Sequence, residues 1–460
     1  MTRIDDLQKR YPSIPRDVIV KYDFMVRGVR GSDGLDKVSE WRPGGAEPYQ
    51  NKDFDGTLQH LAEKMPQGVK PGYMLRHPKS LRFKSGLGTE IRLRSTSTYA
   101  IREISENKYA LYDGEDRVED VYFISRQPRT TPEPVTSKGT PISTLLDIRP
   151  RCFQVTLTRH CQYFSVGEQC KFCNFNVGHE AARSIGLDVP VTINLEEAVE
   201  AFKIRSSEVR QLEGFILMGG VVRADQEARI FFDFVEKLAV AESYKPNLGV
   251  HTQAMDRKDM QRLKHAGADS FSIQIEVMDP QLFPEICPGK EKHTPYEQWI
   301  EAFHDAVDIF GVGNVAGKLV PGVTLLSPNG HNTWQEARDY HIGANRWMIK
   351  NGILPSYVPL WWAPGSAYGE DPCNLDKFPP TEYHLEVALA HHEAMLEFGL
   401  YEKMNKFIYC ALDCVGIYSG DIGMLNIAGD IGNWMSDVVP DEANWMARFV
   451  ESAKSPAKAQ

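Results

Sequence analysis

The sequence lacks any long hydrophobic run. No segment approaches the ~18 consecutive apolar residues that a transmembrane helix requires. The first residues, Met-Thr-Arg-Ile-Asp-Asp, are charged and lack the apolar core of a signal peptide. We therefore expect a cytoplasmic protein with no membrane partner.

An excess of basic residues is also missing, because 52 Lys and Arg face 62 Asp and Glu, for a net charge of −10. Nucleic acids are bound by basic surfaces, so none is expected as a partner. Repeats and biased segments are absent as well, and 42% hydrophobic with 25% charged residues is an ordinary globular composition. At 460 residues the chain exceeds the usual size of one compact domain.

Cysteine is scarce, with eight residues. Disulfides are uncommon in the cytoplasm, so these thiols indicate metal binding, catalysis or simple burial. Cys152 lies in a predicted strand, where packing is the simplest explanation.

The chain divides into three parts by pattern. Residues 1–150 read as an N-terminal extension with short strands, among them a hairpin from Lys108–Tyr112 and Val118–Ser125 around Asp113-Gly114. Residues 151–365 alternate strands with helices, and residues 366–460 add a helix and an irregular segment. We predict an α/β fold in which 151–365 form a partial (β/α)6 TIM-type barrel. The N-terminal extension is expected to cover the active site and the C-terminal segment to close the barrel mouth. A doubly wound sheet is the alternative.

The predicted elements follow from periodicity and capping signals. Strands are expected at residues 153–158, 214–220, 248–254, 270–277, 315–326 and 353–360. Helices are expected at residues 195–209, 228–241, 295–310, 333–350 and 381–397. Asn194 and Asp256 are candidate N-caps, and Gly267 is expected to end the helix that Asp256 begins.

The most informative motif follows the first of these strands. Cys161, Cys170 and Cys173 form a C-x8-C-x2-C pattern in the loop at the strand's carboxyl end, where α/β barrels build active sites. Soft thiolates favour iron–sulfur clusters or zinc over harder metals. Three ligands leave one iron of a [4Fe–4S] cluster open to another molecule.

This motif resembles that of the radical S-adenosylmethionine (SAM) superfamily, where three cysteines follow the first strand and an aromatic residue, here Phe172, precedes the third. A glycine-rich end of the second strand, here Gly219-Gly220, is typical of the family and meets the SAM amino group. The resemblance implies reductive cleavage of SAM to a 5′-deoxyadenosyl radical, which abstracts hydrogen from a small-molecule substrate. It also implies an electron donor such as flavodoxin or ferredoxin.

Polar faces on later strands indicate a lumen that holds a polar ligand. Alternation places Ser270, Ser272, Gln274 and Glu276 on one face of the fourth strand, and Gln253 and Lys318 are expected to join them. Buried polar groups without partners cost ~2 kcal/mol or more each, so a ligand or water should satisfy them. By resemblance to the biotin-synthase-like branch, Gln274 and Glu276 would hydrogen-bond the SAM ribose. A purely structural polar network is the alternative.

Several interpretations stay open at this point. A second iron–sulfur cluster on Cys287, Cys373, Cys410 and Cys414 competes with simple burial of these thiols. The apolar wall of a substrate pocket would come from Trp361, Trp362 and Tyr368. A structural zinc site completed by His160, or a pure electron carrier, are alternative functions. The residues identify neither the substrate nor the reaction subtype, whether rearrangement, methyl transfer or sulfur insertion. They also leave open whether SAM is regenerated and whether the chain forms oligomers.

Overall fold

The computed structural model describes a large part of the chain, in two compact units. Described are residues 2–30, 40–43, 74–77, 80–83, 88–91, 94, 97–106, 108–123, 134–148, 152–176, 190–206, 214–222, 224–241, 247–357, 360, 366–369 and 377–404. The first unit includes residues 1–125 and 380–392, and the second includes residues 126–379 and 393–410.

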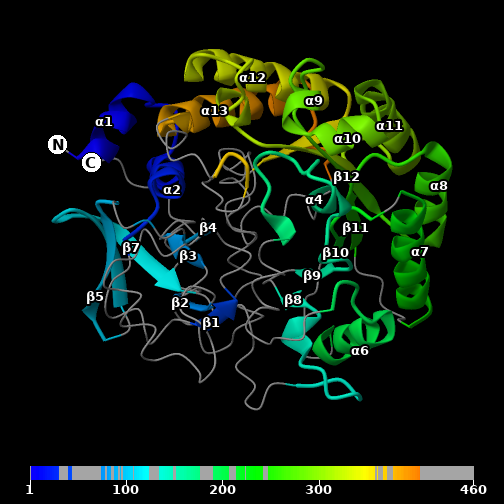
Figure 1. The fold of residues 1–460 in the computed structure, drawn as a ribbon. Helices are drawn as coiled ribbons and strands as arrows, with labels where there is room; N and C mark the ends of the chain where they lie inside the picture. Colours follow the sequence, from blue (N-terminus) through cyan, green and yellow to red (C-terminus); the bar gives the residue numbers. More distant parts are fainter. Residues whose placement is uncertain are drawn as a thin grey trace. The chain divides into compact units, whose positions relative to one another are not determined.

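The first unit combines α1, α2 and the larger part of α13 with antiparallel sheets (Figure 1). Its five-stranded sheet has the order β4-β3-β7-β6-β5, and a separate pair joins β1 to β2. The predicted hairpin is confirmed, because β6 and β7 pair antiparallel across the turn at Gly114. The elements are α1 Arg3–Arg10, α2 Arg16–Arg27, β1 Glu40–Pro43, β2 Met74–His77, β3 Ser80–Phe83, β4 Gly88–Glu90, β5 Tyr99–Ser105, β6 Lys108–Asp113 and β7 Asp116–Phe123.

The two N-terminal helices were not among the predicted elements. Helix α1 begins at a capping box, in which the Thr2 hydroxyl accepts from the Asp5 N–H and the Asp5 carboxylate accepts from the Thr2 N–H. That signal is local and stands in the sequence. Helix α2 buries nearly continuous residues from Val18 to Met25, so it lacks the amphipathic stripe that would reveal it.

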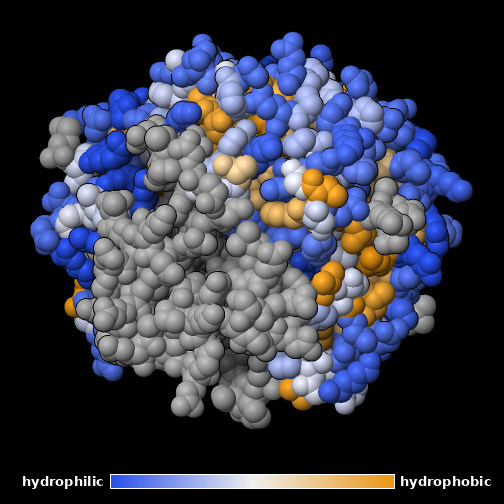
Figure 2. All heavy atoms as spheres, viewed as in Figure 1, coloured by the Kyte–Doolittle hydropathy of each residue, from blue (hydrophilic) through white to orange (hydrophobic). Residues whose placement is uncertain are grey.

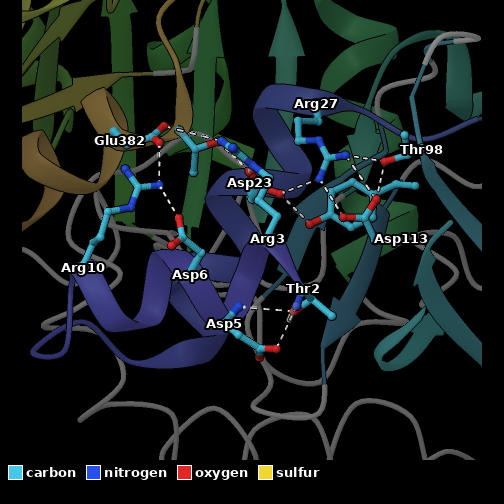
Figure 3. Close-up of polar contacts among 12 residues, drawn as sticks. Thr2, Arg3, Asp5, Asp6, Arg10, Asp23, Arg27, Thr98, Asp113 and Glu382 are labelled. Atoms are coloured by element: carbon cyan, nitrogen blue, oxygen red, sulfur yellow. Dashed lines mark hydrogen bonds and ion pairs between the residues drawn. The ribbon is translucent and has the colours of Figure 1, made fainter. Parts of the chain in front are cut away.

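A buried carboxylate, Asp23 on α2, ties this unit together (Figure 3). It accepts hydrogen bonds from Arg3 Nε at 2.9 Å, Arg27 Nη1 at 3.0 Å, Tyr99 Oη at 2.6 Å and Thr381 Oγ1 at 2.7 Å. These donors come from α1, α2, β5 and the first residue of α13. A fully buried charge needs such compensation, so the network accounts for the packing of four elements around one side chain.

The second unit is built on a sheet of six parallel strands with a short antiparallel strand at one edge. The order β14-β13-β12-β11-β10-β9-β8 follows the sequence without reversal. Figure 1 labels the strands from β8 to β12. A doubly wound sheet reverses its order at a switch point, so this sheet has the order of the predicted partial barrel. It is not closed within the described residues. The strands are β8 Asp147–Ile148, β9 Cys152–Thr156, β10 Gly214–Met218, β11 Asn247–Thr252, β12 Ser270–Glu276, β13 Val315–Leu319 and β14 Ile353–Tyr357.

Helices connect these strands and bury aromatic rings against the sheet. Phe153 of β9 packs edge-on against Phe202 of α6, and Phe271 of β12 stacks on Phe310 of α11. The helices are α4 Gln162–Ser165, α6 Leu195–Ser206, α7 Ala224–Ala241, α8 Arg257–Ala266, α9 Phe283–Ile286, α10 Pro288–His293, α11 Tyr296–Phe310 and α12 Trp334–Lys350. Helix α13 Thr381–Glu397 belongs to the first unit up to residue 392, and its last residues belong to the second. Short 3₁₀ turns lie at Ile142–Thr144 and Val323–Leu325.

The predicted caps are confirmed. The Glu197 N–H donates to Asn194 Oδ1 at 3.1 Å and the Asp259 N–H to Asp256 Oδ1 at 2.8 Å. Gly267 ends α8 with a φ of 121°, a conformation that glycine adopts without strain.

The predicted fifth strand, 315–326, is too long, because β13 ends at Leu319. Pro321 has no N–H to donate to a neighbouring strand, and Gly322 takes a φ of 76°. The chain therefore turns into the 3₁₀ segment Val323–Leu325. The last strand ends at Tyr357 and lies at the sheet edge, where Pro355 costs little.

No described helix has both the length and the apolar character needed to span a membrane. On the face shown in Figure 2, hydrophilic residues predominate over the outer helices α8, α11 and α12.

Candidate active site

The loop after β9 holds its first cysteine through a side chain further along. Cys161 is the N-cap of α4 and has an extended backbone. Its N–H donates to Asn176 Oδ1 at 2.7 Å, and Asn176 Nδ2 donates to the Cys161 carbonyl at 3.1 Å. Asn176 follows Cys173 by three residues, so this double contact closes the cysteine loop on itself.

The three predicted ligands lie within electrostatic reach of one another. The Cys173 N–H donates to the Cys170 carbonyl at 3.0 Å, and the thiols of Cys161 and Cys173 each interact with that of Cys170. Burial raises the pKa of Cys161 and Cys173. The pKa of Cys170 is lowered, chiefly by a hydrogen bond from the Cys287 thiol. The fold therefore gathers the trio at the carboxyl end of the first parallel strand.

The donor set fits a cluster of soft metal ions. Three thiols suit iron–sulfur chemistry, because soft sulfur ligands favour iron–sulfur clusters or zinc over harder metal ions. Among the described residues, no three His, Cys, Asp or Glu side chains converge on the position of a single metal ion. A cluster of several irons would not require Cys161, Cys170 and Cys173 to meet at a single ion.

Glycines at the end of β10 let the neighbouring strand approach the cysteine loop. A Cβ on Gly219 would lie 2.4 Å from Thr158 Oγ1, and one on Gly220 would lie 2.3 Å from the His160 carbonyl oxygen. The Gly220 N–H donates to the Thr158 carbonyl at 2.9 Å, and Thr158 Oγ1 donates to the Gly220 carbonyl at 2.7 Å. This close approach explains both glycines; their contact with SAM stays a prediction.

The end of β12 departs from regular strand geometry. Its pairing with β13 is irregular between Ile273 and Glu276. Among the residues that the structure describes, Glu276 is the one non-glycine residue in the left-handed region, with a φ of 72°. Such a conformation costs about 1–3 kcal/mol and clusters with bulges at functional sites.

Glu276 is held by a buried lysine of the short helix α10. Lys290 Nζ lies 3.1 Å from Glu276 Oε1, with side-chain exposures of 7% and 9%, and it also donates to the Gln274 carbonyl. Burial alone would lower the pKa of Lys290, but the Glu276 carboxylate and the Cys170 and Cys287 sulfurs raise it above its ordinary value. The ammonium therefore stays charged beside the cysteine loop.

The structure describes the burial of the other residues that were predicted to bind SAM. Gln253 is buried, and its Oε1 accepts from Tyr163 Oη of the cysteine loop at 3.2 Å. Gln274 and Phe172 are half-buried, and so is Lys318 on β13. Their role in binding SAM, like that of Glu276, stays a prediction.

The histidine of the alternative zinc site is engaged by hydrogen-bonding neighbours. His160 Nε2 lies 3.1 Å from Ser165 Oγ, and its Nδ1 lies 3.0 Å from Asn176 Nδ2. Both ring nitrogens therefore have partners other than a metal.

The proposed second-cluster cysteines separate. Cys287 is fully buried against Cys170, whereas Cys373, Cys410 and Cys414 lie outside the described residues. Trp361 and Trp362 of the predicted substrate wall lie outside them too. Tyr368 donates its N–H to the Lys171 carbonyl at 2.9 Å, beside the cysteine loop, and burial raises its pKa to about 12.

Sequence reasoning missed Asn176, Tyr163 and Lys290. Each of them contacts a residue far away in the sequence or in another element, and the sequence pattern did not indicate these contacts. For Lys290 a signal existed, since a lysine follows Cys-Pro-Gly in the loop after the fourth strand, but only folding brings it to Glu276.

Comparison with known proteins gives one match in sequence and several in structure. No family model matches the chain. It is 28% identical over 193 residues to bacteriochlorophyllide c C-7(1)-hydroxylase of Chlorobaculum limnaeum, covering 38% of this chain and 47% of that protein. The chain thus spans about half the length of this curated relative.

The solved structures include methylornithine synthase, PylB, with a TM-score of 0.38 and 15% identity over 55% of this chain and 62% of that one. The hydrogenase maturase HydG from Carboxydothermus hydrogenoformans has a TM-score of 0.37 and 16% identity, covering 53% and 51%.

The roles of Cys161, Cys170 and Cys173 and of the residues placed around them stay predictions of the sequence.

Proposed function

We propose that the chain is a radical SAM enzyme that holds one [4Fe–4S] cluster on Cys161, Cys170 and Cys173, cleaves SAM reductively, and abstracts hydrogen from a small molecule. One observation carries this proposal: three thiols of a single loop gather at the carboxyl end of the first strand of a sequentially ordered parallel sheet. The sequence match to a hydroxylase supports it.

Cys161, Cys170 and Cys173 would hold the cluster, which when bound would supply the one electron needed to cleave SAM to methionine and a 5′-deoxyadenosyl radical. The chain's own residues position and shield this chemistry. Asn176 fixes the backbone of Cys161, and the Lys290–Glu276 pair fixes the end of β12. Burial of Cys170 limits access of water to the thiol. Because these groups are already ordered in the folded protein, the reaction does not lose free energy in ordering them.

The remaining expectations complete the proposal. A one-electron donor such as flavodoxin or ferredoxin would reduce the enzyme, and a cytoplasmic location would keep the thiols reduced. Gln253, Gln274, Glu276, Lys318, Phe172 and the Gly219-Gly220 turn would line the SAM site.

Anaerobic purification followed by reduction with SAM tests the proposal. We expect a brown protein with about four irons per chain and release of 5′-deoxyadenosine, detected by chromatography. Cys170→Ala should lose iron and reduce the release to background, whereas the matched control Cys152→Ala should keep both.

Other outcomes identify the alternatives. Colourless protein with one zinc would indicate a structural zinc site. A cluster without any release of 5′-deoxyadenosine would indicate an electron carrier. Equal release from wild type and Cys170→Ala would remove Cys170 from its assigned role.

A further inference from the structure

The parallel sheet of the second unit has a face covered by helices and an inner face. On the covered face, Phe153 and Phe271 contact rings of α6 and α11. A Cβ on Gly317 would lie 2.6 Å from the Met348 side chain of α12, so β13 presents Gly317 to the same covered face. Side chains alternate along a strand, and Lys318 therefore lies on the inner face.

The inner face is accessible only toward the carboxyl ends of its strands. Four side chains nearer the amino ends are buried, namely Ile216, Ser270, Ala316 and Leu354. Four side chains nearer the carboxyl ends are half-buried, namely Met218, His251, Gln274 and Lys318. The cysteine loop follows β9 at this same end of the sheet, so a ligand on the accessible half would lie on the side of the proposed cluster.

Lys318 carries an uncompensated charge on this face. Among the residues that the structure describes, its ammonium has neither an ion-pair nor a hydrogen-bond partner. The six parallel strands contain one acidic residue, Glu276, and that carboxylate is paired with Lys290. A partly buried ammonium without a counter-ion favours an anionic ligand.

A hydroxyl stands next to this ammonium. Ser356 of β14 is in register with Lys318 of β13, so both side chains lie on the inner face of neighbouring strands. Within the described part of the chain the Ser356 hydroxyl also has no hydrogen-bond partner, although the residue is only 7% exposed. One ammonium and one hydroxyl match a carboxylate, whereas a phosphate carries a charge of about −1.5 to −2 and would need further cations.

SAM and the substrate are the two sources of a carboxylate here, because Lys318 is also among the residues proposed to line the SAM site. SAM carries its one carboxylate on the methionine part, close to the sulfonium that takes up the electron, so this group belongs near the cysteine loop after β9. Along the sheet, β13 and β14 are the fourth and fifth strands from β9. This separation favours the substrate as the source.

We propose that Lys318 and the Ser356 hydroxyl bind a carboxylate of the substrate on the inner face of the sheet. This inference rests on the proposed function and names a substrate class for it, a small carboxylic acid. Anchoring the carboxylate at β13 and β14 would hold the rest of the molecule in one orientation toward the SAM site, as preorganised binding requires.

Binding of small probes to the full-length, cluster-loaded protein tests this site. Equilibrium dialysis under anaerobic conditions measures the affinity for benzoate, for its neutral analogue benzamide, for inorganic phosphate and for SAM. The variants are Lys318→Gln, Lys318→Arg and Ser356→Ala. Lys258→Gln removes the same charge from an exposed position of α8 and serves as the control. Circular dichroism and iron content confirm that each variant is folded and loaded.

Wild type should bind benzoate more tightly than benzamide or phosphate. Lys318→Gln should weaken benzoate binding by about 10-fold or more, as expected for the loss of a hydrogen bond to a charged group, and leave SAM binding unchanged. Lys318→Arg keeps the charge and should restore most of the affinity, Ser356→Ala should weaken binding by about 2- to 10-fold, and Lys258→Gln should match wild type. If Lys318→Gln does not fold, Lys318→Arg and Ser356→Ala decide.

Equal affinities of wild type for benzoate and benzamide, or of wild type and Lys318→Gln for benzoate, would overturn the inference and leave the proposed function intact. Tighter binding of phosphate than of benzoate would overturn the carboxylate assignment. Loss of SAM binding in folded, loaded Lys318→Gln would overturn it in favour of SAM as the source. Wild-type protein that binds no cluster would overturn the proposed function, and the substrate assignment with it, whatever the dialysis shows.

Discussion

Replacing Gly220 with alanine tests how the sheet holds the cysteine loop. The added Cβ would lie 2.3 Å from the His160 carbonyl oxygen, 2.6 Å from its carbon and 2.7 Å from Phe175 Cε1. Two of these atoms are backbone, so no flexible side chain can move aside. Overpacking of this kind costs about 1–3 kcal/mol, and here the shift would displace the residue next to Cys161.

Gly343 provides the matched control. It lies within α12, is exposed, and a Cβ there would meet nothing within 4 Å. Alanine in a helix interior is more stable than glycine by roughly 0.5–1 kcal/mol, so Gly343→Ala should raise the free energy of unfolding. The two variants should therefore differ by about 1.5–4 kcal/mol, with Gly220→Ala the less stable.

Urea titration of the iron-free proteins, followed by circular dichroism, measures this difference. Iron binding after cluster assembly gives a second readout, which Gly220→Ala should reduce and Gly343→Ala should leave unchanged. Equal stabilities for the two variants would refute the close approach of the β10 end to the cysteine loop.

Two further predictions concern α12. His341 is buried, and burial lowers its pKa from 6.5 to about 3. Between pH 6.5 and pH 3 the unfolded chain therefore binds a proton at His341 that the folded chain does not bind. The stability of this unit should therefore fall as pH drops from 6.5 toward 3, and the non-titrating variant His341→Gln should show a shallower fall in urea titrations. At the start of the helix, Thr333 forms a capping box with Glu336. Thr333→Ala should lower the free energy of unfolding by about 0.5–2 kcal/mol, and equal stability of Thr333→Ala and Thr333→Ser would contradict the capping role.

A zinc site and an iron–sulfur cluster would need different ligands from the cysteine loop. A zinc site would recruit His160, whose ring nitrogens are engaged by Ser165 and Asn176. A cluster uses the cysteines alone and leaves that histidine to brace the loop. We favour the cluster because it needs only the three cysteines as ligands, whereas the zinc site would also need His160, whose ring nitrogens already have hydrogen-bond partners.

Local chemistry determined much of the fold in advance. Asn194, Asp256 and Gly267 cap helices with their own neighbours, so the start of α6 and both ends of α8 could be predicted from residues a few positions apart. The parallel sheet followed from the alternation of strands and helices. The Thr2–Asp5 capping box was equally local, and α1 was predictable from it.

The order of the strands within the sheet distinguishes a partial barrel from a doubly wound sheet. The sequence could not predict this order, because both folds have the same alternation of strands and helices along the chain. The candidate site divides in the same way. Spacing and position selected Cys161, Cys170 and Cys173, whose loop is continuous in sequence. Folding alone brings Lys290 to Glu276 and Cys287 to Cys170, because hydrogen bonds between distant segments depend on packing that no local pattern encodes.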